Sequence, residues 1–339
     1  PLYSSAASDV YKRQAITNAP VGCAALLSTA ERFLFALGAS SNPRLVKWSD
    51  QEDNTTWTAA ATNQAGDFEL NTVGSLKCGK RVRGINLLFT DVDVHTATYV
   101  GLPYVYSFER AGSGCGVISS QSVAAIDSAA MWMSRSGFWT FDGYVKPMAC
   151  DVSDYVFTNM NYNQASKVYA VHNSKYGEVW WFYPSSASNE VDSYVTYNYR
   201  ENHWNIGVMG RTAGVDRGIF LYPIMVDASG YIYEHEVGYD YDGGSVYAES
   251  GPYEIGVGEN IMSVRQVIPD EQTLGEVVIS FKSRMYPTST ETTHGPYPAS
   301  QPTDVRFSGR QVKIRYTGAV LEDWRVGVNR VEAVAAGKR

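Results

Sequence analysis

Short apolar runs recur along the chain, and each is followed by a polar turn and an aromatic run. The runs are FLF at 33, LLF at 87, MWM at 131, VWW at 179 and IMV at 224, with a weaker sixth, VVI, at 277. Positions 87, 131, 179 and 224 are separated by 44, 48 and 45 residues. An interval of about 40–50 residues is typical of one β-propeller blade, which contains four antiparallel strands. The pattern therefore predicts a propeller.

The segments after these runs have the form of hairpins. MWM is followed by the turn SRSG and then by FWTFDG, and IMV is followed by DASG and then by YIYEHEVG. We expect Gly137, Gly143 and Gly230 to lie in turns, and we expect Gly137 and Gly230 to take a positive φ.

The most aromatic segment, VWWFYPSSASNEVDSYVTYNYRENHWNIG at 179–207, makes a longer version of the same unit. Val195, Tyr197 and Tyr199 alternate along one strand, and the turn RENH contains Asn202, a residue that tolerates the left-handed conformation. Trp204 and a following isoleucine continue on the returning strand. The segment therefore reads as a hairpin with one aromatic face.

Aromatic side chains are expected to fill the gaps between blades. Blade sheets stack face to face, so both faces of a central strand are covered, and VWWFYP needs no strict alternation. The residues assigned to this packing are Trp132, Trp139, Trp180, Trp181, Tyr197, Trp204 and Tyr231.

One short helix is expected among the strands, over residues 151–161. Ser153 is placed to cap its N-terminus, and Val156 and Met160 are spaced i, i+4 on one face. The helix would lie between two blades.

The chain is expected to have three parts. Residues 1–14, PLYSSAASDVYKRQ, resemble the translated read-through of a sequencing adapter, with a disordered leader as the alternative. The adapter interpretation predicts that the natural N-terminus is missing. Residues 15–244 are assigned to about four to six blades, which need not close a ring. In residues 245–339 the regular spacing of the apolar runs is weaker, and this part is assigned to a β-sandwich or to closing strands. The predicted fold class is all-β throughout.

Composition narrows the choice of function. The net charge is −7 and the isoelectric point is near 5.3, which argues against a surface that grips phosphates. No apolar run approaches the 18 or so residues of a membrane span. The four cysteines, Cys23, Cys78, Cys115 and Cys150, fit no common zinc spacing, and we expect buried reduced thiols.

The acidic and histidine-containing motifs are not expected to form metal-binding or catalytic sites. EHE at 234–236 favours a solvated strand over a metal site, and DYDGG at 240–244 lacks the later ligands of a calcium loop. SRSGFW at 134–139 has the outline of an Asp-box turn, but Ser136 stands where that motif needs an acidic residue. Asp91 and Asp93 lie in a predicted turn, where aspartate is common, so a catalytic pair is disfavoured.

Nucleophile and phosphate motifs are also missing from the sequence. No serine lies in a G-x-S-x-G elbow, and GSGCG at 112–116 lacks the Lys-Ser/Thr of a phosphate loop and is expected to be a close-packed connection. The single basic cluster, KCGKRVR at 77–83, is expected to be a solvated loop or a subunit contact. We therefore predict no catalytic, cofactor-binding or metal-binding residue and no cofactor.

Several phrases in order resemble tail proteins of short-tailed bacteriophages. They are ERFLFALGA, LVKWSDQEDNTTWT, GSGCGVIS, MWMSRSGFWTFDG, NSKYGEVWWFYP, YVTYNYRENHWNIG and RTAGVDRGIFLYP with DASGYIYEHE. The chain resembles, over about residues 31–335, the propeller-bearing nozzle and packaged-DNA-stabilisation (tail hub) proteins.

The resemblance implies a non-enzymatic structural protein of the virion tail, assembled in the host bacterial cytoplasm. Its partners would be copies of itself in a ring, often a hexamer, and other tail or portal proteins. DNA would pass through without sequence-specific binding, and no membrane would be involved. Acidic loops such as TDVDVH and SDQED are expected to face the lumen. The alternative is a propeller that binds or hydrolyses host-surface glycans.

Overall fold

The computed structural model describes residues 15–239, 246–270 and 273–337. The chain forms two compact units, of which the first ends at Glu236 and the second begins at Val237. The leader over 1–14, the expected boundary at 244/245 and the motif DYDGG lie outside the described residues.

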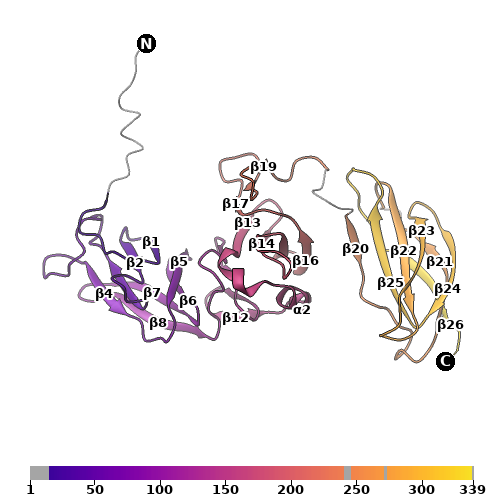
Figure 1. Cartoon of the computed structure of the whole chain (residues 1–339), viewed down its shortest axis with the longest axis horizontal. Coiled ribbons are helices and arrows are strands. Elements are labelled where there is room, and N and C mark those ends of the chain that lie inside the picture. Colours follow the sequence, from indigo (N-terminus) through magenta and orange to yellow (C-terminus); the bar gives the residue numbers. More distant parts are fainter. Residues whose placement is uncertain (1–14, 240–245, 271–272, 338–339) are drawn as a thin grey trace, which may run out of the picture. The chain divides into compact units, whose positions relative to one another are not determined.

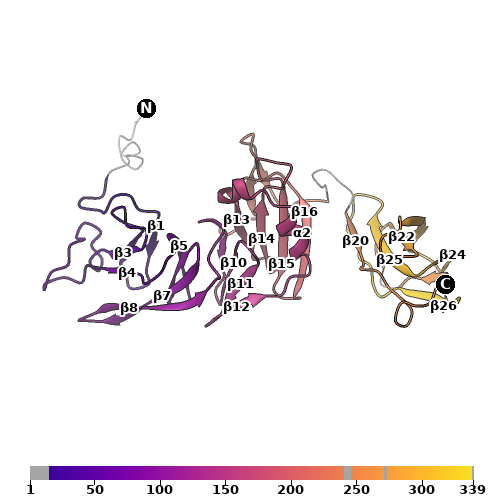
Figure 2. The same cartoon turned by 60° about the horizontal axis from the view of Figure 1, so that its bottom comes forward.

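The first unit consists of successive antiparallel sheets, each built from strands that follow one another in the chain (Figures 1 and 2). The first sheet contains β1 (Ala25–Ser28), β2 (Leu34–Leu37), β3 (Leu45–Trp48) and β4 (Gly66–Glu69). The second contains β5 (Leu76–Val82), β6 (Ile85–Thr90), β7 (Asp93–Gly101) and β8 (Val105–Ser113). The third contains β9 (Val123–Ala125), β10 (Ala130–Met133), β11 (Phe138–Phe141) and β12 (Val145–Met148). The fourth contains β13 (Tyr169–Asn173), β14 (Glu178–Tyr183), β15 (Ser193–Asn198) and β16 (His203–Val208). A fifth, three-stranded sheet contains β17 (Ala213–Val215), β18 (Ile224–Val226) and β19 (Ile232–Glu234).

The sheets are arranged as β-propeller blades. The first strand of each sheet packs beside the first strand of the next, so that β1 contacts β5, β5 contacts β9, β9 contacts β13 and β13 contacts β17. No comparable packing joins the described strands of the fifth sheet to those of the first. The predicted all-β propeller is confirmed, and its described blades form an open series.

The recurring apolar runs mark one structural position, the second strand of each blade. LLF lies in β6, MWM in β10, VWW in β14 and IMV in β18, while FLF overlaps the start of β2. The sixth run, VVI, is not a blade, because it lies in β22 of the second unit. Burial alternates strictly along β22, whereas all four residues of β10 are buried. An apolar triplet is compatible with both environments, so it could not distinguish them.

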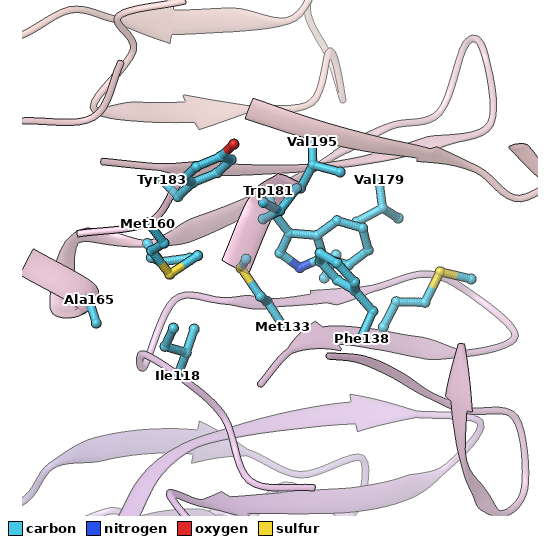
Figure 3. Close-up of a cluster of buried hydrophobic side chains, with 13 residues drawn as sticks. Ile118, Met133, Phe138, Met160, Ala165, Val179, Trp181, Tyr183 and Val195 are labelled. Carbon is cyan, nitrogen blue, oxygen red and sulfur yellow. The ribbon is translucent and has the colours of Figure 1, made fainter. Parts of the chain in front are cut away.

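Trp181 lies at the centre of the packing between the third and fourth sheets (Figure 3). Its side chain is fully buried, and its Nε1 donates a hydrogen bond to the backbone oxygen of Ser122 at 3.0 Å. The Phe138 ring lies 5.0 Å from it, between ring centroids. Trp132 has the same role between the second and third sheets, where its Nε1 donates to the backbone oxygen of Cys115 at 2.6 Å.

The other predicted packing aromatics are less deeply placed. Trp139, Trp180, Tyr197 and Trp204 are half-buried. Tyr231 does not pack between blades, because 68% of the residue is exposed. It ends the turn before β19, and its backbone N–H donates to Asp227 Oδ1 at 2.9 Å. The turn uses the backbone of Tyr231 and leaves its ring in solvent.

Most of the predicted turn conformations are present. Gly143, Gly230 and Asn202 have φ values of +136°, +86° and +56°. Gly137 was wrongly assigned a positive φ. The Ser134 N–H donates to the Gly137 oxygen at 2.8 Å, and this bond closes the loop without a left-handed residue at 137.

The predicted helix is present as α2 (Ser153–Thr158), and a 3-10 helix, η1 (Tyr162–Lys167), follows it. Ser153 is not its cap. The capping position is Val152, with no side-chain cap, because the chain turns early enough for the Ser153 N–H to donate to the Cys150 oxygen at 3.2 Å. Val156 is fully buried.

The second unit is a β-sandwich. One sheet has the order β20 (Tyr247–Glu249), β25 (Gln311–Gly318), β22 (Val277–Arg284) and β23 (Thr292–Pro298). The other has the order β24 (Thr303–Gly309), β21 (Met262–Ile268) and β26 (Arg330–Ala335). Val264, Ile279, Phe281 and Phe307 come from both sheets and share one core. The strands after 245 thus form their own sandwich, one of the two expected arrangements.

All four cysteines are free thiols. Cys78 and Cys115 are buried as expected, and burial raises the pKa of both. Cys23 and Cys150 are only half-buried, contrary to the expectation of four buried thiols.

Trp181→Ala tests the importance of inter-blade packing. The substitution removes a fully buried indole and one of the two hydrogen bonds to the Ser122 oxygen, the other being donated by the Met133 N–H, so we expect a loss of about 3–5 kcal/mol in the free energy of unfolding. Chemical denaturation measures the change. Tyr104→Ala is the control, because Tyr104 is 80% exposed and should change the value by less than about 0.5 kcal/mol. Equal effects of the two substitutions would contradict the packing role.

Candidate functional site

The fifth sheet presents a largely apolar face that no other described strand of the first unit covers. Residues along its strands alternate between two faces, and the face with Gly214, Met225 and Tyr233 lies toward the fourth sheet. The opposite face carries the residues that we call the open face: Ala213, Val215, Ile224, Val226, Ile232 and Glu234. Val215 is 52% exposed and Ile232 is 73% exposed.

The loop between β17 and β18 adds to this apolar surface. Ile219, Phe220 and Leu221 are exposed by 96%, 51% and 75%. In a propeller, such a blade face normally packs against another blade. A contiguous exposed apolar surface on a folded protein marks an interaction site. The fifth sheet is therefore the candidate assembly surface of the first unit.

Asp93 belongs to a buried polar cluster between the first two sheets. Its Oδ2 accepts from Thr72 Oγ1 at 2.8 Å, and its Oδ1 accepts from Thr90 Oγ1 at 2.6 Å. His95 Nε2 lies 3.2 Å from Oδ1 without a well-aligned hydrogen bond, and Arg110 Nε lies 3.5 Å from Oδ2. Burial lowers the pKa of His95, so the cluster favours the neutral imidazole.

Asp91 has a separate environment from Asp93. It accepts from the Ser75 N–H at 2.7 Å and pairs with Lys77 at 3.5 Å near the surface. The two carboxylates therefore hold different loops and do not form a catalytic pair. Because only 3% of Asp93 is exposed, its side chain cannot line a lumen, whereas Asp91 is exposed, so the lumen-facing position of TDVDVH stays a prediction.

A second polar cluster links the fourth and fifth sheets. The Tyr199 hydroxyl lies 3.0 Å from His172 Nε2, and His172 Nδ1 lies 3.6 Å from Asp216 Oδ2. Asn173 Nδ2 donates to Glu236 Oε1 at 3.0 Å. Burial lowers the pKa of His172 and raises that of Glu236.

In this second cluster a phenol, an imidazole and a carboxylate follow one another, from Tyr199 through His172 to Asp216. The 3.6 Å between His172 Nδ1 and Asp216 Oδ2 is too long for a hydrogen bond. Its evident action is to fasten β13 to the fifth sheet. No local motif in the sequence marks this cluster, because His172 and Asp216 are 44 residues apart. Only the contact between neighbouring blades brings them together.

The remaining motifs are structural. Within the described part of the chain, no group of three or more histidine, cysteine or acidic side chains could hold a metal. In EHE, the strand ends at Glu234, and Glu236 has a φ of +64°, so alternation does not extend to it. His235 Nε2 lies 3.0 Å from Arg211 Nε. The turn SRSG joins β10 to β11, as expected.

Two other predictions had opposite outcomes. KCGKRVR is mostly strand and not a loop. Most of it lies in β5, where Cys78 and Val82 are buried and Arg81 is exposed to solvent. GSGCG is a close-packed connection, as expected. A Cβ on Gly116 would lie 2.2 Å from backbone atoms of Asp91 and Val92.

Among the described residues, no helix is both long and apolar enough to cross a membrane.

Comparison with known proteins gives only distant similarity. No protein-family model matches the chain, and no curated protein matches its sequence. Among solved structures, the AfRom2 CNH domain is 11% identical, with 72% of this chain and 80% of that chain covered and a TM-score of 0.38. The N-terminal domain of Nup159 is 8% identical, with coverages of 62% and 60% and a TM-score of 0.37. An exo-β-1,3-galactanase from Phanerochaete chrysosporium, solved with galactose, is 10% identical, with coverages of 89% and 93% and a TM-score of 0.30. Likeness at this level carries no argument about activity.

The buried His95 predicts a pH dependence of stability. Its pKa in the folded chain lies below the ordinary 6.5, so the unfolded chain takes up the proton first as the pH falls. The free energy of unfolding should therefore decrease as the pH falls through about 6.5, and the stabilisation should be retained above it. Denaturation curves between about pH 7.5 and about pH 5.5 should show a smaller decrease for His95→Gln than for the unmodified protein.

His203→Gln is the matched control for His95, because the His203 side chain is 54% exposed. It should keep the full pH dependence. If His95→Gln and His203→Gln had the same slope, His95 would not be held neutral by its surroundings.

Proposed function

We propose that this chain is a structural component of a bacteriophage tail, in the nozzle or the head–tail hub. In this role it helps to form the DNA conduit and to retain packaged DNA, and it performs no catalysis. The proposal rests first on the ordered phrases that resemble such tail proteins. The single structural observation that supports it is the open face of the fifth sheet, which has the exposed apolar side chains that suit a protein–protein contact.

A second copy of the chain is the proposed occupant of the open face. The described blades form an open series, so one apolar blade face is available for a subunit contact. Head-to-tail contacts between identical subunits generate closed rings when the rotation closes. A ring of copies is the assembly that a conduit needs, and a hexamer is the expected size.

Charge supports a conduit through which DNA moves. The net charge of −7 gives no overall cationic surface that would release counterions and hold DNA tightly. The blades supply rigidity, since their cores contain interlocked aromatic rings such as Trp132 and Trp181. In this proposal, DNA passes without sequence-specific binding, and the outer contacts are to portal and other tail proteins.

The proposed location follows from this role. The protein is assembled in the cytoplasm of the host bacterium and ends in the tail of the virion. Its work there is mechanical, namely sealing a channel and opening it once.

Self-assembly provides the direct test. The purified full chain should form rings in negative-stain micrographs and should elute as an oligomer in size-exclusion chromatography with light scattering. Ile232→Glu places a charge in the open face, and burying that charge in a contact is costly, so this variant should remain monomeric. Circular dichroism and the melting temperature verify that it is folded.

Val73→Glu is the matched control, because Val73 is 92% exposed and lies outside the open face. This variant should assemble like the unmodified protein. A folded unmodified protein that stays monomeric at high concentration would overturn the proposed occupant. So would assembly that is equally sensitive to both substitutions.

A further inference from the structure

A cleft of about 520 Å³ lies between the third and fourth sheets. This volume is within the range of about 300–1,000 Å³ that is usual for small-molecule sites. One wall comes from the third sheet, where Met131, Thr140 and Lys146 form a cross-strand row. The opposite wall comes from the fourth sheet, where Tyr197 pairs with Trp204.

The aromatic wall is held in place before any ligand enters. Trp204 Nε1 donates to the Ala149 oxygen at 2.8 Å, and the Tyr197 hydroxyl donates to Asn202 Oδ1 at 2.8 Å. The two rings lie 4.6 Å apart, between centroids. Both are only half-buried, so part of each ring remains available to a ligand. Fixed rings lose little conformational freedom on binding, which favours affinity.

The cleft also contains a carboxylate that a ligand can reach. Asp142 lines it, with 39% of its side chain exposed, and its Oδ2 accepts from Lys146 Nζ at 2.6 Å. A carboxylate oxygen can accept more than one hydrogen bond, so Oδ2 can also accept from a ligand hydroxyl.

Charge selects the class of ligand. Lys146 already neutralises Asp142, so a cation gains little there, and an anion meets Asp142 and the exposed Asp151 at the rim. A neutral ligand with hydroxyl donors and an apolar face fits both walls. A pyranose sugar has these properties, because its ring carries hydroxyls at the edge and C–H groups on its faces.

We propose that the cleft between the third and fourth sheets binds a neutral saccharide unit, which packs on Trp204 and Tyr197 and donates a hydroxyl hydrogen bond to Asp142. Binding involves no covalent step. The inference does not depend on the proposed tail role, because it uses only side chains inside the first unit.

Saturation-transfer NMR on the full chain tests this site. The probes are glucose, galactose, mannose, rhamnose and N-acetylglucosamine, with choline chloride as a cationic probe and glucose 6-phosphate as an anionic one. At least one neutral sugar should receive saturation and should change the tryptophan fluorescence, while choline and the phosphate should not. Asp142→Asn removes the charge and one acceptor with little change in shape, and it should weaken binding of that sugar about tenfold or more.

Asp154→Asn is the matched control, because Asp154 lies in the first turn of α2 and does not line the cleft. It should bind like the unmodified protein. Both variants are first compared by melting temperature, and Tyr197→Leu serves as a second cleft variant if Asp142→Asn is unstable. Failure of every neutral sugar would overturn the proposal, and so would binding of choline or the phosphate in their place. Equal affinities of the cleft and control variants would also overturn it.

Discussion

The structure of the first unit depends on the burial of sheet faces against one another. Its blades are short, with strands of three to nine residues, and a single repeat unit of this kind cannot bury its hydrophobic face by itself. Stacking of the sheets buries the apolar faces that a single sheet would leave in solvent. Trp132 and Trp181 occupy two successive gaps, and each satisfies its indole N–H with a backbone oxygen outside its own strand, of Cys115 and Ser122. The aromatic content of the chain is therefore a consequence of its architecture.

Polar groups between the blades restrict the relative position of neighbouring sheets. Asp93 accepts hydrogen bonds from the hydroxyls of Thr72 and Thr90, which lie in two segments of the chain. The His172 cluster joins β13 to residues that follow β17 and β19. Buried polar groups must be paired in a specific geometry, so they restrict how two sheets can slide across each other. These groups therefore fix the relative position of neighbouring blades.

The same stacking rule has two consequences for binding. Where two sheets pack closely, aromatic rings are buried in the core, but a cleft remains in one part of the gap between the third and fourth sheets, with Tyr197 and Trp204 on one wall. Where the series of described sheets ends, a whole face remains apolar and exposed. The first situation suits a small ligand with polar and apolar sides, and the second suits a protein surface. The proposed sugar site and the proposed assembly surface thus have one structural origin.

The sequence alone determined the fold class and the period of the blades, because an apolar run recurs once per blade, in its second strand. It also located α2 and the left-handed Asn202, which depend on local backbone preferences. It could not separate the VVI run of the sandwich from a blade, since both environments accept the same residues. Nor could it assign Tyr231 to solvent, relate His172 to Asp216, or place Asp142 in one cleft with Tyr197 and Trp204. Those features arise from contacts between residues far apart in the chain, and such contacts exist only once the blades are stacked.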